Sequence, residues 1–176
     1  MIPGEKITLR AIEKRDVEFL RNLRNKPEMR KYLCSHMPIS EIQQVGWYER
    51  SASDARNQIF MVDDPAGETV GYVQLTNIDY KNRSVEIGIH LGPSAQGKGY
   101  GRDAFHTLMR FAFEEMNMHR VYLYVFAFNE RAIGLYEKLG FREEGRLRDS
   151  VFQEGRYQDI VLMSILESEF ADRSSP

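Results

Sequence analysis

A glycine-rich loop between a strand-like and a helix-like segment constrains the fold of this 176-residue chain most. Before the loop, residues 85–91 (VEIGIHL) alternate apolar and polar side chains, which is typical of a β-strand. After it, apolar residues recur at helical spacing from Ala104 to Met116. The loop Gln96–Gly101 (QGKGYG) holds three glycines, which allow positive φ angles and a close approach to a ligand. Since a helix N-terminus offers free N–H groups and a positive dipole end, this arrangement predicts binding of a phosphate or diphosphate.

The two commonest phosphate-binding patterns do not fit this loop. The Walker pattern requires a hydroxyl residue after its lysine, but Lys98 is followed by Gly99. The dinucleotide pattern G-x-G-x-x-G also fails, because the glycine after Gly97 and Gly99 comes one place early, at Gly101. A Rossmann unit would moreover begin the chain with this element.

The rest of the chain alternates strand and helix patterns in the order β-α-α-β-β-β-α-β-α-β-β. We predict helices from Glu13 to Pro27, after a Ser40 N-cap, over 104–116, and from an Asn129 cap to Gly140. Strands are predicted over 7–11, 59–62, 69–79, 85–91, 121–128, 141–152 and 157–166, the last two joined as a hairpin at Glu154-Gly155. Residues 121–128 are apolar throughout and are therefore expected to be buried on both faces. The order predicts an α/β chain with a mixed sheet.

Composition bounds the partners and the setting. No repeat or linker divides the chain, so we expect one domain over residues 1–170 and a flexible tail over 171–176. A net charge of −2 argues against a nucleic-acid partner, and the longest apolar run is too short for a membrane helix. The single cysteine, Cys34, excludes an intrachain disulfide and a cysteine-based zinc site. With no apolar leader at the N-terminus, a cytoplasmic protein is expected.

Two blocks of the sequence carry a resemblance to a known family. Gln96-x-x-Gly99-x-Gly101 is similar to the Q/R-x-x-G-x-G/A signature of the GNAT N-acetyltransferase superfamily. The second block, Asn129–Ala132 followed by Leu135–Phe141, also resembles that family, and the resemblance covers about residues 5–167. The ending, Glu144–Arg146 with Gly155–Asp159, resembles the branch of ribosomal-protein N-terminal acetyltransferases and spermidine acetyltransferase. Leu23–Asn25 and Gly46–Tyr48 are similar to amino-sugar nucleotide N-acetyltransferases.

The resemblance implies a fold and a cofactor. The fold would be a single-domain, mixed, mostly antiparallel sheet with splayed central strands, flanked by helices. Acetyl-CoA would be the co-substrate, with its diphosphate on the loop, its pantetheine arm along the strand 85–91, and no metal. The residues implied in cofactor binding are Ile89, Leu91, Gln96, Gly97, Lys98, Gly99, Tyr100, Gly101, Arg102 and Asn129.

Acetyl transfer to an amine requires a base and an acid. A lysine-like amine has a pKa of about 10.4, so it must lose a proton before it attacks the thioester. The departing thiolate leaves more readily when an acid protonates it. The resemblance places the acid at Tyr136, and Glu86, on the polar face of its strand, is our choice for the base or water-orienting group. His90 shares that face and is the alternative base.

The acceptor is expected to be a primary amine of a small molecule, either an amino-sugar nucleotide or a polyamine. Candidate lining residues lie in the first two helices and the final hairpin: Tyr32, Trp47, Tyr48, Phe152 and Tyr157. Residues 27–56 hold four acidic and four basic residues, whereas spermidine acetyltransferases resembling this chain carry an acid-rich stretch there. An amino-sugar nucleotide therefore suits this stretch at least as well. The alternatives are a protein N-terminus, a non-catalytic acyl-CoA-binding module, and an interaction domain whose loop is only a turn; a homodimer is expected.

Overall fold

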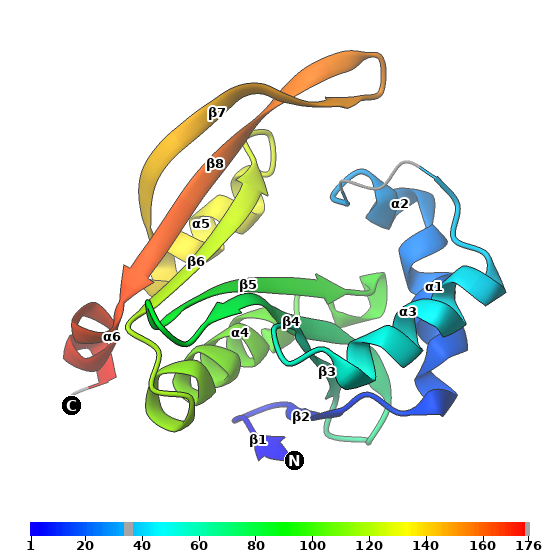
Figure 1. Ribbon diagram of the computed structural model, residues 1–176, viewed down its shortest axis with the longest axis horizontal. Helices are drawn as coiled ribbons and strands as arrows, with labels where there is room; N and C mark the ends of the chain where they lie inside the picture. The colour runs from blue at the N-terminus through cyan, green and yellow to red at the C-terminus, as the bar shows by residue number, and fades with distance from the viewer. Residues whose placement is uncertain (34–36, 175–176) are drawn as a thin grey trace. The chain divides into compact units, whose positions relative to one another are not determined.

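The computed structural model describes residues 1–33 and 37–174 (Figure 1). The chain divides into two compact units. Unit 1 comprises Met1–Thr76 and Gly88–Leu108, and unit 2 comprises Asn77–Ile87 and Met109–Pro176. The strands β4 (Thr69–Asp79) and β5 (Ser84–Leu91) run from one unit into the other. Each unit is therefore described by itself.

Unit 1 begins with two strands, continues with a run of helices and returns to two further strands. Its elements are β1 (Ile2–Pro3), β2 (Thr8–Ala11), η1 (Lys14–Asp16), α1 (Val17–Asn25), α2 (Pro27–Arg30), α3 (Glu41–Ser53), β3 (Gln58–Asp63) and most of β4. The strands pair antiparallel in chain order, β1–β2–β3–β4. The predicted Ser40 cap of α3 is confirmed, because its hydroxyl accepts from the Gln43 N–H at 3.3 Å.

A hydrophobic cluster holds the helices of unit 1 to its strands. The apolar face of α1 contributes Leu20 and Leu23, which pack with Met61 of β3 and Tyr72 of β4. Trp47 of α3, which is partly buried, packs against this cluster. The second half of β5, the short turn η2 (Pro93–Ala95) and the helix α4 (Tyr100–Arg110) complete the unit, with Leu108 the last residue of the helix that belongs to it.

Unit 2 contains the last residues of β4, the first residues of β5, and the strands and helices that follow α4. Its further elements are the π-helical turn η3 (Phe111–Glu115), β6 (Arg120–Phe126), α5 (Glu130–Leu139), β7 (Arg142–Gln153), β8 (Arg156–Leu166) and α6 (Glu167–Ser174). Ser84–Glu86 of β5 lie opposite Arg120–Tyr122 of β6, and β6 pairs antiparallel with β8. β7 and β8 form a long hairpin (Figure 1), and Glu154 and Gly155 both have positive φ at its turn.

The α/β fold with a mixed, mostly antiparallel sheet is confirmed. The predicted order of elements recurs with short additions: β1, α2 and α6. The expectation that the segment 121–128 is buried on both faces is wrong, because Tyr124 is 49% exposed while Val121 and Leu123 are buried. α6 includes residues 171–174 of the segment expected to be a tail. Cys34 and residues 175–176 lie outside the described residues. Within the described parts of the chain, no helix is both long and apolar enough to cross a membrane.

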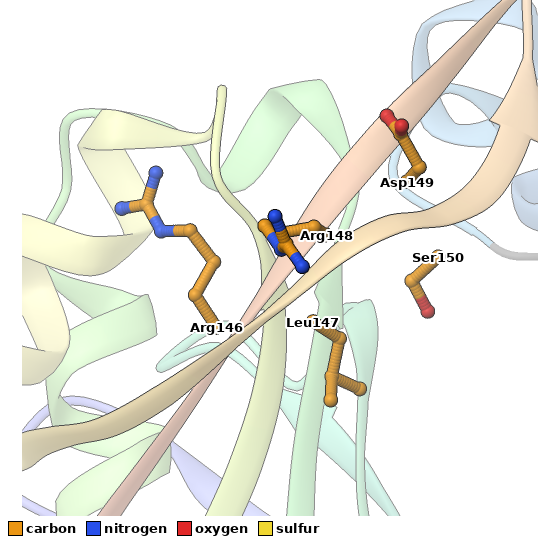
Figure 2. Close-up of a pocket in the computed structure, with 5 residues that line it drawn as sticks. All are labelled: Arg146, Leu147, Arg148, Asp149 and Ser150. Atoms are coloured by element: carbon orange, nitrogen blue, oxygen red, sulfur yellow. The ribbon is translucent and has the colours of Figure 1, made fainter.

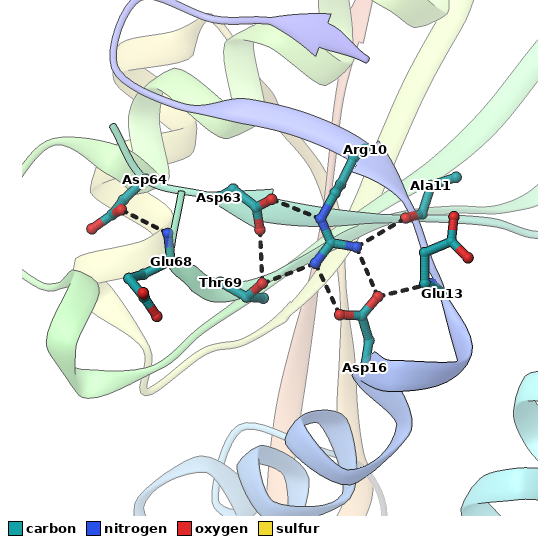
Figure 3. A network of polar contacts seen from close by, with 8 residues as sticks. All are labelled: Arg10, Ala11, Glu13, Asp16, Asp63, Asp64, Glu68 and Thr69. Atoms are coloured by element: carbon teal, nitrogen blue, oxygen red, sulfur yellow. Dashed lines mark hydrogen bonds and ion pairs between the residues drawn. The ribbon is translucent and has the colours of Figure 1, made fainter. Parts of the chain in front are cut away.

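A buried ion-pair network ties three strands of unit 1 to the start of α1 (Figure 3). The Arg10 guanidinium donates to both carboxylate oxygens of Asp16 at 2.8 Å and to Asp63 at 2.7 Å. The Thr69 hydroxyl accepts from Arg10 and donates to Asp63. Burial alone would raise the pKa of Asp16, but the hydrogen bonds from Arg10 and from the Glu13 N–H, with the Arg10 charge, lower it.

Asp16→Asn is expected to lower the free energy of unfolding by about 3–5 kcal/mol, because it leaves a buried guanidinium without its bidentate partner. The pKa of Asp16 is lower in the folded than in the unfolded chain. Its stabilisation is therefore present above the unfolded pKa of about 3.9 and is lost as pH falls through the folded value. Denaturant unfolding from neutral to acid pH measures both effects.

The matched control is the surface pair Arg21–Glu41, whose glutamate side chain is 79% exposed. Glu41→Gln should change the unfolding free energy by less than about 1 kcal/mol, because solvent screens an exposed pair. Equal losses in Asp16→Asn and Glu41→Gln would show that the buried network does not hold unit 1 together.

Candidate active site

The glycine loop of unit 1 has the backbone geometry that its sequence predicts. Residues 96–99 form a turn after η2, and α4 begins at Tyr100. Gly97 and Gly99 have φ angles of 76° and 81°, in the left-handed region that side-chain-bearing residues rarely adopt. A Cβ built on Gly97 would meet no atom within 4 Å, so the loop is open on that side.

The backbone N–H groups of this loop form a row of available donors. The Asp103 N–H donates to the Gly99 carbonyl at 3.2 Å and so closes the first helical turn. Among the described residues, no backbone hydrogen bond outside the helices uses the N–H groups of residues 97–102. Together with the positive end of the α4 dipole, this row fits a diphosphate.

The end of β5 lies against the start of α4 within unit 1. A Cβ at Gly101 would lie 3.5 Å from Cδ1 of Leu91 and 4.0 Å from Cδ1 of Ile89. The structure therefore brings Ile89 and Leu91 close to Gly101. The other predicted loop residues belong to the same unit: Gln96, Gly97, Lys98, Gly99, Tyr100 and Arg102. This part of the predicted cofactor site is continuous within one unit.

His90, the alternative base, faces away from Ile89 and Leu91 because neighbouring strand residues alternate. Its ring stacks on Tyr72 with 4.7 Å between centroids. Burial, with a smaller contribution from the Arg24 charge, lowers the pKa of His90 to about 4. His90 is therefore neutral near pH 7 and is packed against Tyr72, and Glu86 remains our candidate base.

Three predicted residues belong to unit 2. Asn129 caps α5, since its Oδ1 accepts from the Ala132 N–H at 3.3 Å. Tyr136 is 9% exposed and lies beside Phe141, and burial raises the pKa of its hydroxyl to about 12. Glu86 accepts from Nδ2 of Asn77 at 2.7 Å.

The aromatic residues expected to line the acceptor pocket divide between the units. In unit 1, the Arg24 guanidinium lies 5.2 Å from the centre of the Trp47 ring, and Tyr32 and Tyr48 belong to the same unit. In unit 2, Phe152 and Tyr157 meet edge to face with 5.1 Å between centroids, and both are exposed.

A hollow that the sequence did not predict lies along β7 in unit 2 (Figure 2). It has a volume of about 610 Å³ and is lined by Arg146, Leu147, Arg148, Asp149 and Ser150. The register of β7 against β8 shifts between Leu147 and Val151, which coincides with this stretch. Most residues of β7 are exposed, so the sequence of this strand gives no signal for such a hollow.

Comparison with known proteins settles the family. The sequence model of the acetyltransferase (GNAT) domain family matches residues 6–142 of the chain. The chain belongs to the GNAT acetyltransferase family. It is 36% identical to spermidine N(1)-acetyltransferase of Vibrio cholerae serotype O1, over 97% of this chain and 99% of the relative. It is 32% identical to the putative ribosomal N-acetyltransferase YdaF of Bacillus subtilis, over 95% and 94% of the two chains.

A solved structure supports the same assignment. The crystal structure of spermidine N-acetyltransferase from Vibrio cholerae in complex with CoA and spermine superposes with a TM-score of 0.91 at 36% identity, covering 94% of this chain and 98% of that chain. This GNAT protein is therefore an N-acetyltransferase that uses acetyl-CoA as co-substrate. The predicted family, fold class, enzyme class and co-substrate are confirmed. The free N–H groups of residues 97–102 fit the cofactor's diphosphate.

Sequence reasoning missed two residues at the loop of this GNAT domain. The carboxylate of Asp103, in the first turn of α4, accepts the backbone N–H groups of residues 5–7. Lys6 thereby comes to the loop, with its Nζ 3.3 Å from the place of a Gly99 Cβ. These contacts join residues nearly one hundred positions apart, so no local sequence pattern predicts them.

Proposed function

We propose that the chain acetylates a primary amine of a polyamine, with Tyr136 as the acid and Glu86 as the base. The observation that carries the proposal is the near full-length likeness to the spermidine N-acetyltransferase of Vibrio cholerae, whose structure holds CoA and spermine. Acetyl-CoA, when bound, supplies an acetyl thioester. The N–H groups of residues 97–102 would hold its diphosphate, with Ile89, Leu91 and Asn129 along the pantetheine arm.

The proposed mechanism needs two proton transfers, one away from the attacking amine and one to the departing sulfur. An aliphatic ammonium with a pKa of about 10.4 gives up its proton to Glu86, directly or through one water. Asn77 donates to Oε2 of Glu86, and among the residues that the structure describes no hydrogen bond uses Oε1. Tyr136 Oη keeps its proton because burial raises its pKa to about 12, so it remains able to protonate the departing sulfur.

An amino-sugar nucleotide is the second candidate acceptor, favoured by the charges of unit 1. Nη1 of Arg24 donates to Oε1 of Gln44 at 3.4 Å, and its Nε is buried without a hydrogen-bond partner. Among the described residues, Arg24 forms no ion pair with a carboxylate. A guanidinium without a carboxylate suits the phosphates of a nucleotide.

An acceptor screen distinguishes the candidates. The chain is incubated with acetyl-CoA and, separately, spermidine, spermine, an amino-sugar nucleotide or an N-terminal peptide, and mass spectrometry detects the acetylated product. Acetylation of spermidine or spermine in preference to the other acceptors would support the proposal. Acetylation of the amino-sugar nucleotide alone would replace it with the second candidate, and acetylation of the peptide alone would replace both.

Glu86→Gln is expected to lower kcat/KM for the acceptor by about 10²–10⁴, because an amide cannot take up the proton of the ammonium. Steady-state kinetics measure this loss, and the loss should shrink as pH rises and the free amine becomes more abundant. Glu137→Gln, on the exposed face of α5, is the control that removes the same charge. A Glu86→Gln enzyme as active as the control would remove Glu86 from the mechanism.

We also propose a single domain over residues 1–170, a cytoplasmic location and a homodimer. The family match over residues 6–142 and the relatives' coverage support the first of these. Light scattering of the purified chain measures the oligomeric state, and a monomer mass would contradict the homodimer.

A further inference from the structure

The side chain of Lys6 lies over the glycine loop of unit 1. Its Nζ is 3.3 Å and its Cδ 3.8 Å from the place where a Gly99 Cβ would stand. Gly99 is followed at once by Tyr100, the first residue of α4. The ammonium of Lys6 is therefore beside the donors that fit the cofactor's diphosphate.

Asp103 fixes this position through the backbone rather than through the ammonium. Its Oδ2 accepts the N–H groups of Lys6 and Ile7 at 2.6 and 3.0 Å, and its Oδ1 accepts that of Glu5 at 3.1 Å. Three charge-assisted hydrogen bonds to consecutive residues hold the segment before β2 against the first turn of α4. Because the carboxylate is engaged with backbone groups, it leaves the Lys6 charge available.

The charge of Lys6 has no counter-ion within the described parts of the chain, where its ammonium forms no ion pair. Lys98, the lysine of the loop itself, has its Nζ 5.6 Å from the centre of the Tyr100 ring. An exposed ammonium beside free N–H donors attracts a phosphate more than it attracts a neutral group.

We propose that Lys6 binds a phosphate group of CoA and that Asp103 is the residue that positions it. The proposal rests on the CoA site at the glycine loop, and it adds to that site a residue from the N-terminal end of the chain. The phosphate that Lys6 binds belongs either to the diphosphate of CoA or to its 3′-phosphate, and both are anions that a lysine ammonium can bind. A lysine that supplies one charge-assisted contact at an exposed site should contribute a factor of about ten to affinity.

Titration calorimetry with CoA measures this contribution without turnover. Lys6→Met should raise the Kd about tenfold, Lys6→Arg should restore most of the affinity, and added salt should narrow the difference. Lys26→Met, at an exposed lysine after α1, is the matched control and should bind as the wild type does. Dephospho-CoA separates the two phosphates. An unchanged Lys6→Met penalty points to the diphosphate, and its disappearance points to the 3′-phosphate.

Asp103→Asn tests the positioning role. If Asp103 acts through Lys6, the double variant Asp103→Asn with Lys6→Met should bind CoA no more weakly than Lys6→Met alone. Equal CoA affinity of wild type and Lys6→Met would overturn the proposal, whatever happens to Asp103→Asn. Absence of CoA binding to the wild type at millimolar concentration would instead overturn the cofactor site itself, and the role of Lys6 with it.

Discussion

Gly99→Val is expected to abolish measurable binding of acetyl-CoA. Gly99 has φ at 81°, and a branched side chain there is strained by about 1–2 kcal/mol. Its Cβ would lie 3.3 Å from Nζ of Lys6, so the side chain would also stand among the groups that fit the diphosphate. A thermal-shift titration measures the loss. Ligand at a hundred times its Kd should stabilise the wild type by about 2.7 kcal/mol and the variant by nothing.

Gly67→Val is the matched control for backbone strain. Gly67 also has φ at 81°, but it lies in the turn between β3 and β4, and a Cβ there meets no atom within 4 Å. Both variants should therefore lose similar stability, while only the loop variant loses the cofactor. Retained acetyl-CoA stabilisation in Gly99→Val would show that the loop does not hold the diphosphate.

Local sequence patterns predicted the helices and strands well where the side chains are either clearly apolar or clearly polar. β4 begins and ends at the residues expected, and Asn129 and Gly140 delimit α5, because alternation and caps are local properties. β6 differs since tyrosine combines an apolar ring with a polar hydroxyl. Tyr122 and Tyr124 pack edge to face at 6.0 Å while Tyr124 remains half exposed. Counting both as apolar hid the alternation of that strand.

The candidate site divides in the same way between local and distant contacts. Positive φ at Gly97 and Gly99 is a local property of the glycine-rich loop, so the backbone conformation of this loop could be predicted from the sequence. The partner of Glu86 could not. Arg83, the nearest basic residue in the sequence, donates to Asn117 and Glu167, and the side chain that donates to Glu86 is that of Asn77. Which side chain reaches a carboxylate depends on pairing between strands, which a linear pattern does not specify.

Tyr136→Phe is expected to lower kcat about a hundredfold while leaving the Kd for acetyl-CoA within about twofold, since an acid contributes about 10²–10⁴ to the rate. Because burial raises the pKa of Tyr136 to about 12, the wild-type hydroxyl stays protonated below about pH 11. Its deprotonation therefore produces no fall in kcat across the neutral range. Single-turnover kinetics and calorimetry on the same preparation measure the rate and the affinity separately.

Packing and chemistry make different predictions for this tyrosine, which lies at the buried face of α5 beside Phe141. If Tyr136 only fills the core, removing its hydroxyl changes the unfolding free energy by about 0.5–1.5 kcal/mol and leaves kcat unchanged. Tyr124→Phe, on the half-exposed face of β6, removes a phenol from the same unit and is the control. A fall in kcat in Tyr136→Phe alone, at equal folded fraction, assigns the proton of the leaving thiol to Tyr136. Equal kcat in the two variants would mean that solvent, and not Tyr136, protonates the departing thiolate.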